Sequence, residues 1–153
     1  MLDTTPTLAP AADFLESDMA RVDSVIRERL ASRVALIDQI SAYIISAGGK
    51  RVRPMLVLLF SRALGFGGPE RFELAATVEF IHTATLLHDD VVDESALRRG
   101  RQTANALFGN AASVLVGDFV YSRAFQMMVS VNRMRVLEVL ADATNVIAEG
   151  EVL

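Results

Sequence analysis

The chain has 153 residues, enough for one domain with its own core, and 52% of them are hydrophobic. A net charge of −4 and a pI near 5.1 exclude nucleic acid as the main partner. The longest apolar run, Met55 to Phe60, is far shorter than the ~18 residues of a transmembrane segment, and without cysteine there is no disulfide or thiolate chemistry.

Residues 1–11 contain two prolines and none of the basic and apolar regions of a signal peptide, so we expect a disordered N-terminus and a cytoplasmic protein. From there on, apolar residues recur at helical spacing. They predict six helices, over residues 13–30, 34–46, 52–64, 70–93, 110–131 and 133–150. The basic segment 94–109 is predicted to be a loop, and no segment has the alternation of a β-strand. The fold class is therefore all-α, with the other helices packed around residues 70–93.

The end of this central helix carries Asp89, Asp90 and Asp93. Asp89 and Asp93 are four residues apart, so their carboxylates project from one face of a helix, one turn from each other. Three acids at a helix C-terminus oppose the helix dipole, which argues against a merely solvated helix end. Oxygen ligands without cysteine suit Mg²⁺, which binds one or two carboxylates together with substrate phosphates and water.

Two histidines precede these aspartates. His82 lies seven residues before Asp89, on the same helical face, and this alignment favours a functional role over that of a hydrogen-bonded core histidine. His88 points elsewhere on the helix, and we interpret it as structural.

Two basic segments are candidates for phosphate binding. Gly48-Gly49-Lys50-Arg51-Val52-Arg53-Pro54 combines a flexible glycine pair with cations at the start of a helix, where the dipole also attracts anions. Arg98 and Arg99 follow Asp93 closely, and arginine binds phosphate with two parallel hydrogen bonds. Either segment alone could be a solvated basic turn. Together with the aspartates they describe a diphosphate held between Mg²⁺ and guanidinium groups.

Four motifs, GGKRVRP, HTATLLHDDVVD, LRRGRQTAN and VLVGDFVYSRAFQ, occur between residues 48 and 151. In their order and spacing they resemble the trans-isoprenyl diphosphate synthases, in particular the long-chain octaprenyl or decaprenyl type. The resemblance implies a helical bundle of the isoprenoid-synthase type and a Mg²⁺-dependent condensation. In that reaction an allylic diphosphate ionises, isopentenyl diphosphate attacks the carbocation, and a proton is lost.

The resemblance also assigns roles by position. Asp89 and Asp93 would hold Mg²⁺ against the allylic diphosphate, with Asp90 in support, and Arg98 would contact the same diphosphate. A second set of side chains would hold isopentenyl diphosphate: Lys50, Arg53, His82 and Arg99. Ala84 and Thr85 are small residues where a bulky side chain closes the elongation tunnel in this family, which predicts a long product.

No second aspartate-rich motif is present, although the family carries one on a later helix. We therefore expect residues 12–153 to be the N-terminal half of a synthase domain, a bundle truncated to its first six or so helices. We expect little condensing activity from the chain alone. Apolar faces left uncovered would favour self-association, and the resemblance implies a homodimer.

Three alternatives stay open. The enzyme could be a short-chain synthase that makes farnesyl or geranylgeranyl diphosphate. A terpene cyclase also uses an aspartate-rich helix, but it has no need of the isopentenyl diphosphate site at Lys50 and Arg53. A non-catalytic helical subunit of a heteromeric synthase would need neither the aspartates nor Arg98 and Arg99.

Overall fold

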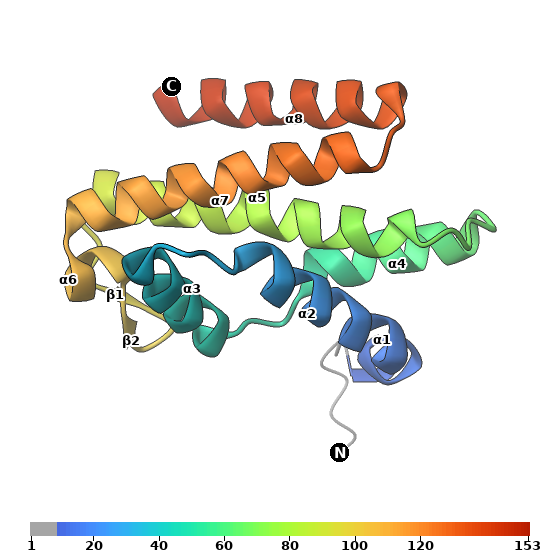
Figure 1. The fold of residues 1–153 in the computed structure, drawn as a ribbon, viewed down its shortest axis with the longest axis horizontal. Helices are drawn as coiled ribbons and strands as arrows, with labels where there is room; N and C mark the ends of the chain where they lie inside the picture. Colours follow the sequence, from blue (N-terminus) through green and yellow to red (C-terminus); the bar gives the residue numbers. More distant parts are fainter. Residues whose placement is uncertain (1–8) are drawn as a thin grey trace, which may run out of the picture.

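The computed structural model describes residues 9–153, which form eight helices and one small β-hairpin (Figure 1). The helices are α1 (Ala9–Phe14), α2 (Glu16–Leu30), α3 (Ala35–Ala47), α4 (Val52–Ala63), α5 (Glu70–Val92), α6 (Ala104–Phe108), α7 (Asn110–Ser130) and α8 (Met134–Val152), and the strands are β1 (Leu97–Arg98) and β2 (Arg101–Gln102). The prediction of an all-α protein is confirmed. No helix in the described range is long and apolar enough to cross a membrane.

Helix α5 is the centre of the bundle, as predicted, and packs against α2, α4, α6 and α7. Its buried side chains include Ala75, Ala76 and Ala84, which are small enough to let neighbouring helices approach closely. Contact with α7 is especially close near Gly117, where a methyl group would lie 2.4 Å from Nε2 of His88. Figure 1 shows α8 as the outermost helix, and it packs chiefly on α7.

Most of the predicted helix ends agree with the structure to within a residue or two, but two segments differ. The predicted helix 13–30 is interrupted at Leu15, where the backbone leaves helical geometry and the side chain is completely buried. Of the predicted disordered segment, residues 1–8 lie outside the described range, and residues 9–11 belong to α1.

The second difference lies in the predicted loop 94–109, which contains β1, β2 and α6. Arg98 pairs with Arg101 in an antiparallel hairpin, and both loop residues, Arg99 and Gly100, have positive φ angles of 52° and 76°. Two positive φ angles are typical of the tight turn that matches the twist of a two-residue hairpin. Thr103 then begins α6, because its hydroxyl accepts a hydrogen bond from the backbone of Ala106. The split first helix and α6 explain why there are eight helices rather than six.

Candidate active site

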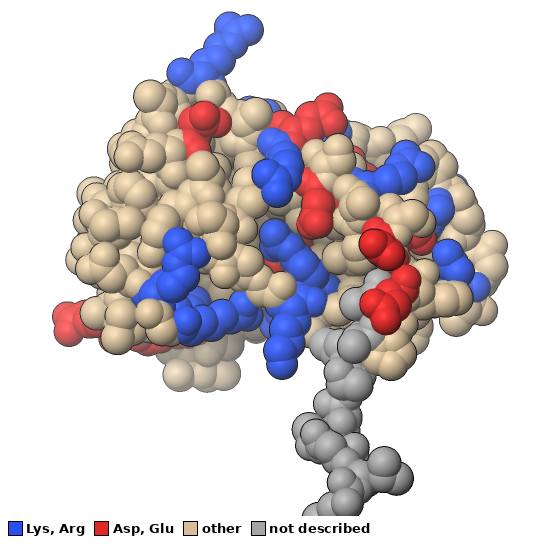
Figure 2. All heavy atoms as spheres, turned by 90° about the horizontal axis from the view of Figure 1, so that it is seen from below, with Lys and Arg blue, Asp and Glu red and all other residues tan. Residues whose placement is uncertain are grey.

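A cavity of about 610 Å³ lies between the ends of α3 and α4, the middle of α5 and the hairpin. This volume is within the usual range for small-molecule sites. Its apolar lining comes from Ile44, Val52, Leu86 and Leu87. The charged lining consists of six cations, two carboxylates and one histidine: Lys50, Arg51, Arg53, Arg98, Arg99, Arg101, Glu79, Asp90 and His82. Figure 2 shows basic side chains gathered on the underside of the molecule, toward the end that holds α3 and the hairpin.

Only two of the six cations are neutralised within the described chain. Arg51 forms an ion pair with Glu79 at 3.0 Å, and Arg98 forms one with Asp90 at 2.6 Å. The other four, Lys50, Arg53, Arg99 and Arg101, form no ion pair with any carboxylate among residues 9–153. Because these cations face one cavity, the cavity favours a ligand with several negative charges.

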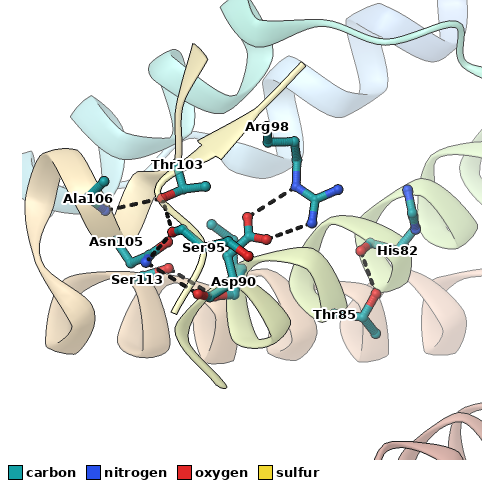
Figure 3. A network of polar contacts seen from close by, with 10 residues as sticks. His82, Thr85, Asp90, Ser95, Arg98, Thr103, Asn105, Ala106 and Ser113 are labelled. Carbon is teal, nitrogen blue, oxygen red and sulfur yellow. Dashed lines mark hydrogen bonds and ion pairs between the residues drawn. The ribbon is translucent and has the colours of Figure 1, made fainter. Parts of the chain in front are cut away.

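Asp90 is the best-anchored acid of this site (Figure 3). Its carboxylate is buried and accepts two hydrogen bonds from Arg98, at 2.6 Å to Nη2 and 3.1 Å to Nε. The hydrogen bond that Arg98 donates to Asp90 raises the pKa of Arg98 above its already high value. Asn105 donates hydrogen bonds to the backbone carbonyls of Asp90 and Ser95, so the hairpin and the end of α5 are tied together. Sequence reasoning gave Asp90 only a supporting role.

His82 also lines the cavity, eight residues before Asp90 on α5. Its pKa is lowered below the usual value of 6.5, mainly by burial and next by the positive charge of Arg53, against an opposing influence of Glu79. The ring is therefore neutral near pH 7 and can both donate and accept a hydrogen bond.

The hairpin is fixed against the end of α3 by polar contacts. The hydroxyl of Tyr43 donates to the carbonyl of Gln102 at 2.6 Å, and Nη1 of Arg99 donates to the carbonyl of Gly48 at 3.0 Å. An alanine in place of Gly49 would displace the guanidinium of Arg99, because its Cβ atom would lie 2.5 Å from Nη1. The two basic segments predicted from the sequence are thus held against each other.

Asp89 and Asp93 do not line this cavity but lie beside it, at the C-terminal end of α5. We call these two aspartates the acidic edge of α5. Both carboxylates are close enough to contribute to the raised pKa of Arg98. On their other side is Glu151 of α8, whose pKa is raised chiefly by Asp89. Asp89, Asp93 and Glu151 therefore repel one another, and their oxygen atoms suit a hard divalent cation. Within residues 9–153 no three acidic or histidine side chains are grouped closely enough to form a metal site by themselves.

The structure thus brings together Lys50, Arg53, His82, Arg98 and Arg99 in one cavity and places the aspartates predicted to hold metal at its edge. His88 faces α7, where it lies 3.2 Å from Asp118, in agreement with a structural role. Ala84 is buried in the core, and neither it nor Thr85 lines the cavity.

The cavity residues that sequence reasoning missed include Tyr43 and Arg101. Arg101 continues the basic run of Arg98 and Arg99, so its position in the sequence could have indicated it. For Tyr43 the sequence contains no such signal.

Comparison with known proteins identifies the family of this chain. The sequence matches the Polyprenyl synthetase family over residues 34–153. It is 64% identical over 141 residues to an octaprenyl diphosphate synthase of Escherichia coli, covering 92% of this chain and 44% of that protein. It is 49% identical over 147 residues to an all-trans-nonaprenyl-diphosphate synthase of Rhodobacter capsulatus, covering 95% of this chain and 44% of that protein.

Solved structures show the same relationship. A decaprenyl diphosphate synthase from Rhodobacter capsulatus superposes with a TM-score of 0.91 at 57% identity, over 95% of this chain and 45% of that one. A polyprenyl synthase from Caulobacter crescentus, crystallised with calcium and isoprenyl diphosphate, gives a TM-score of 0.94 at 49% identity, over 99% of this chain and 46% of that one. The chain spans less than half the length of these relatives, and its fold is the first part of the isoprenoid-synthase bundle. By sequence and by fold, the chain belongs to the Polyprenyl synthetase family.

Proposed function

We propose that the chain provides the N-terminal part of a long-chain polyprenyl diphosphate synthase, which adds isopentenyl diphosphate units to an allylic diphosphate. The observation that carries the proposal is the cavity with four unneutralised cations, Lys50, Arg53, Arg99 and Arg101, next to the acidic edge of α5. In this proposal the cations hold the diphosphate of isopentenyl diphosphate, and Arg98, which lies near Asp89 and Asp93, holds that of the allylic substrate. The names of the octaprenyl and nonaprenyl relatives support a long product.

In this proposal the residues act by binding and by charge stabilisation. Lys50, Arg53 and Arg99 bind the diphosphate of isopentenyl diphosphate, and the neutral ring of His82 donates a hydrogen bond to it. Arg98 contacts the allylic diphosphate. Asp89 and Asp93 would hold Mg²⁺, which when bound stabilises the negative charge that the leaving diphosphate gains. The apolar lining from Leu86 and Leu87 keeps water from the carbocation.

We further propose a long product because α5 carries the small residues Ala84 and Thr85 one turn before Asp89. The short-chain alternative predicts a C15 or C20 product instead. Chromatography of the products made by an enzyme that contains this segment separates the two. A subunit without a catalytic role is less favoured, because it would have no use for the cations that line the cavity.

A thiolo analogue of farnesyl diphosphate, which resists ionisation, tests the proposal. Calorimetry of the chain should show binding that Mg²⁺ strengthens, and Asp89→Ala should lose this Mg²⁺-dependent gain in affinity. Asp142→Ala, which removes an exposed aspartate of α8, is the matched control and should bind as the unchanged chain does. Equal binding by Asp89→Ala would contradict the assignment.

Two further expectations concern the chain by itself. Its turnover of isopentenyl diphosphate should be negligible, because the second aspartate-rich motif of the family is missing from the sequence. Exposed apolar side chains on α7 and α8, such as Leu115, Val129 and Val146, should make it self-associate. Measurable turnover, or a monomer in light scattering at high concentration, would contradict these expectations in turn.

A further inference from the structure

The hairpin residue Arg101 lines the cavity, but neither the family resemblance nor the ion pairs of the site give it a role. Its strand neighbour Arg98 is neutralised by Asp90. Arg101 has no carboxylate partner within the described residues, and three more unneutralised cations line the same cavity. A positive charge kept beside other positive charges raises the energy of the empty site, and a bound anion relieves this repulsion.

Arg101 is also restrained in position. Its guanidinium lies over the ring of Tyr43, 4.7 Å from the centroid, and Nη2 is 3.4 Å from the hydroxyl oxygen of Ser46. Tyr43 itself is fixed by its hydrogen bond to Gln102 and by an edge-on contact with Phe108 at 5.6 Å. A side chain that is already restrained loses little conformational entropy when it binds a ligand.

The contact with Ser46 uses one of the five N–H donors of the guanidinium. The remaining donors can form the two parallel hydrogen bonds that arginine makes with phosphate. We propose that Arg101 is a further diphosphate-binding residue of this cavity, positioned by Tyr43. This inference rests on the proposed function, because it assumes that the cavity binds a diphosphate.

The test is calorimetric titration of the chain with inorganic pyrophosphate in EDTA, so that only the basic cavity and no metal-bridged site is measured. We expect Arg101→Gln to weaken binding about tenfold, as the loss of a charged hydrogen-bond pair does, and Arg101→Lys to weaken it only about threefold. Arg135→Gln is the control, because Arg135 is an exposed residue of α8 that pairs with Glu138. Thermal unfolding of each variant checks that the hairpin and the fold are retained.

Each outcome bears on a different claim. Binding by Arg101→Gln as tight as that of the unchanged chain would overturn the role of Arg101. Equal losses in Arg101→Gln and Arg101→Lys, with a lower unfolding temperature in both, would also overturn it, because they would mean that Arg101 only supports the hairpin. Equal losses without that change in unfolding would support it, because lysine keeps the charge but not the paired hydrogen bonds of arginine. Failure of the unchanged chain to bind pyrophosphate would instead count against the proposed function.

Discussion

The basic cavity and the acidic edge of α5 lie side by side, yet only the cavity is held in place by contacts within the described chain. Arg98, Arg99 and Arg101 each contact a fixed partner, namely Asp90, Gly48 and the ring of Tyr43. Asp89 and Asp93 instead adjoin Glu151, a third acid. The comparison indicates that the cation-rich half of the site is preorganised for a ligand, whereas the acidic half depends on a bound cation.

The largest expected effect tests the cavity. Arg53→Glu replaces an unneutralised cation by an anion and should lower pyrophosphate affinity about 100-fold, which is about 2.7 kcal/mol. Calorimetry measures the change. The same substitution at the exposed residue Arg135 should leave the affinity unchanged, and equal losses in both variants would indicate nonspecific electrostatic attraction instead of a site.

A second prediction concerns the stability of the two halves. Asp90→Ala removes the carboxylate that anchors Arg98, so the free energy of unfolding should fall by about 2 kcal/mol. This is less than for a fully buried pair, because the side chain of Arg98 is 43% exposed and can turn to solvent. Asp93→Ala removes an exposed acid next to other acids and should change stability by less than about 0.5 kcal/mol.

Urea denaturation measures both changes in the free energy of unfolding, provided that the m-value is the same in all variants. If Asp93→Ala proved as destabilising as Asp90→Ala, the two halves would not differ in the way described.

A third prediction sharpens the account of the hairpin. Gly49→Ala forces the guanidinium of Arg99 away from Gly48, so pyrophosphate affinity should fall about tenfold while the stability changes little, because a flexible side-chain tip gives way. Gly67→Ala is the matched control, since a methyl group there has no atom within 4 Å. An unchanged affinity in Gly49→Ala would show that the position of Arg99 does not matter.

These residues also show where sequence reasoning reaches its limit. Helical periodicity and glycine joints located the long helices and the basic segments, because both depend on local sequence. The hairpin was missed because strands of two residues have no periodicity, and because its turn puts Arg99, a residue with a Cβ atom, at a positive φ angle. The interruption at Leu15 was missed because burial of that side chain depends on tertiary packing.

For the candidate site too, the sequence indicated residues but not their arrangement in space. Residue type, spacing and the family resemblance indicated Lys50, Arg53, Arg98, Arg99, His82 and the three aspartates. They did not reveal which aspartate lines the cavity, since the orientation of the end of α5 is set by its contacts with Arg98 and Asn105. The role of Tyr43 as a support for Arg101 requires three-dimensional contacts between distant segments.

The smallest expected effect is a pKa change. Burial and Arg53 hold the pKa of His82 below 6.5 in the free chain, and a bound diphosphate should raise it, because an opposite charge favours the protonated ring. Binding then takes up protons, so the contribution of His82 to affinity grows as pH falls from the bound to the free pKa and is constant below it. NMR titration of His82 measures the shift, with His88 as the internal control. A pKa unchanged by pyrophosphate would place the ligand elsewhere.

The central claim is that one diphosphate contacts Arg98 directly and Asp89 and Asp93 through a shared metal ion. The most direct test measures Mn²⁺ binding by electron paramagnetic resonance in the presence of pyrophosphate, for the unchanged chain and for Arg98→Gln. Removing a positive charge near Asp89 and Asp93 would by simple electrostatics strengthen cation binding. The account predicts weaker Mn²⁺ binding, because the diphosphate that shares the metal loses its contact with Arg98. Mn²⁺ binding that is unchanged or stronger in Arg98→Gln would contradict it.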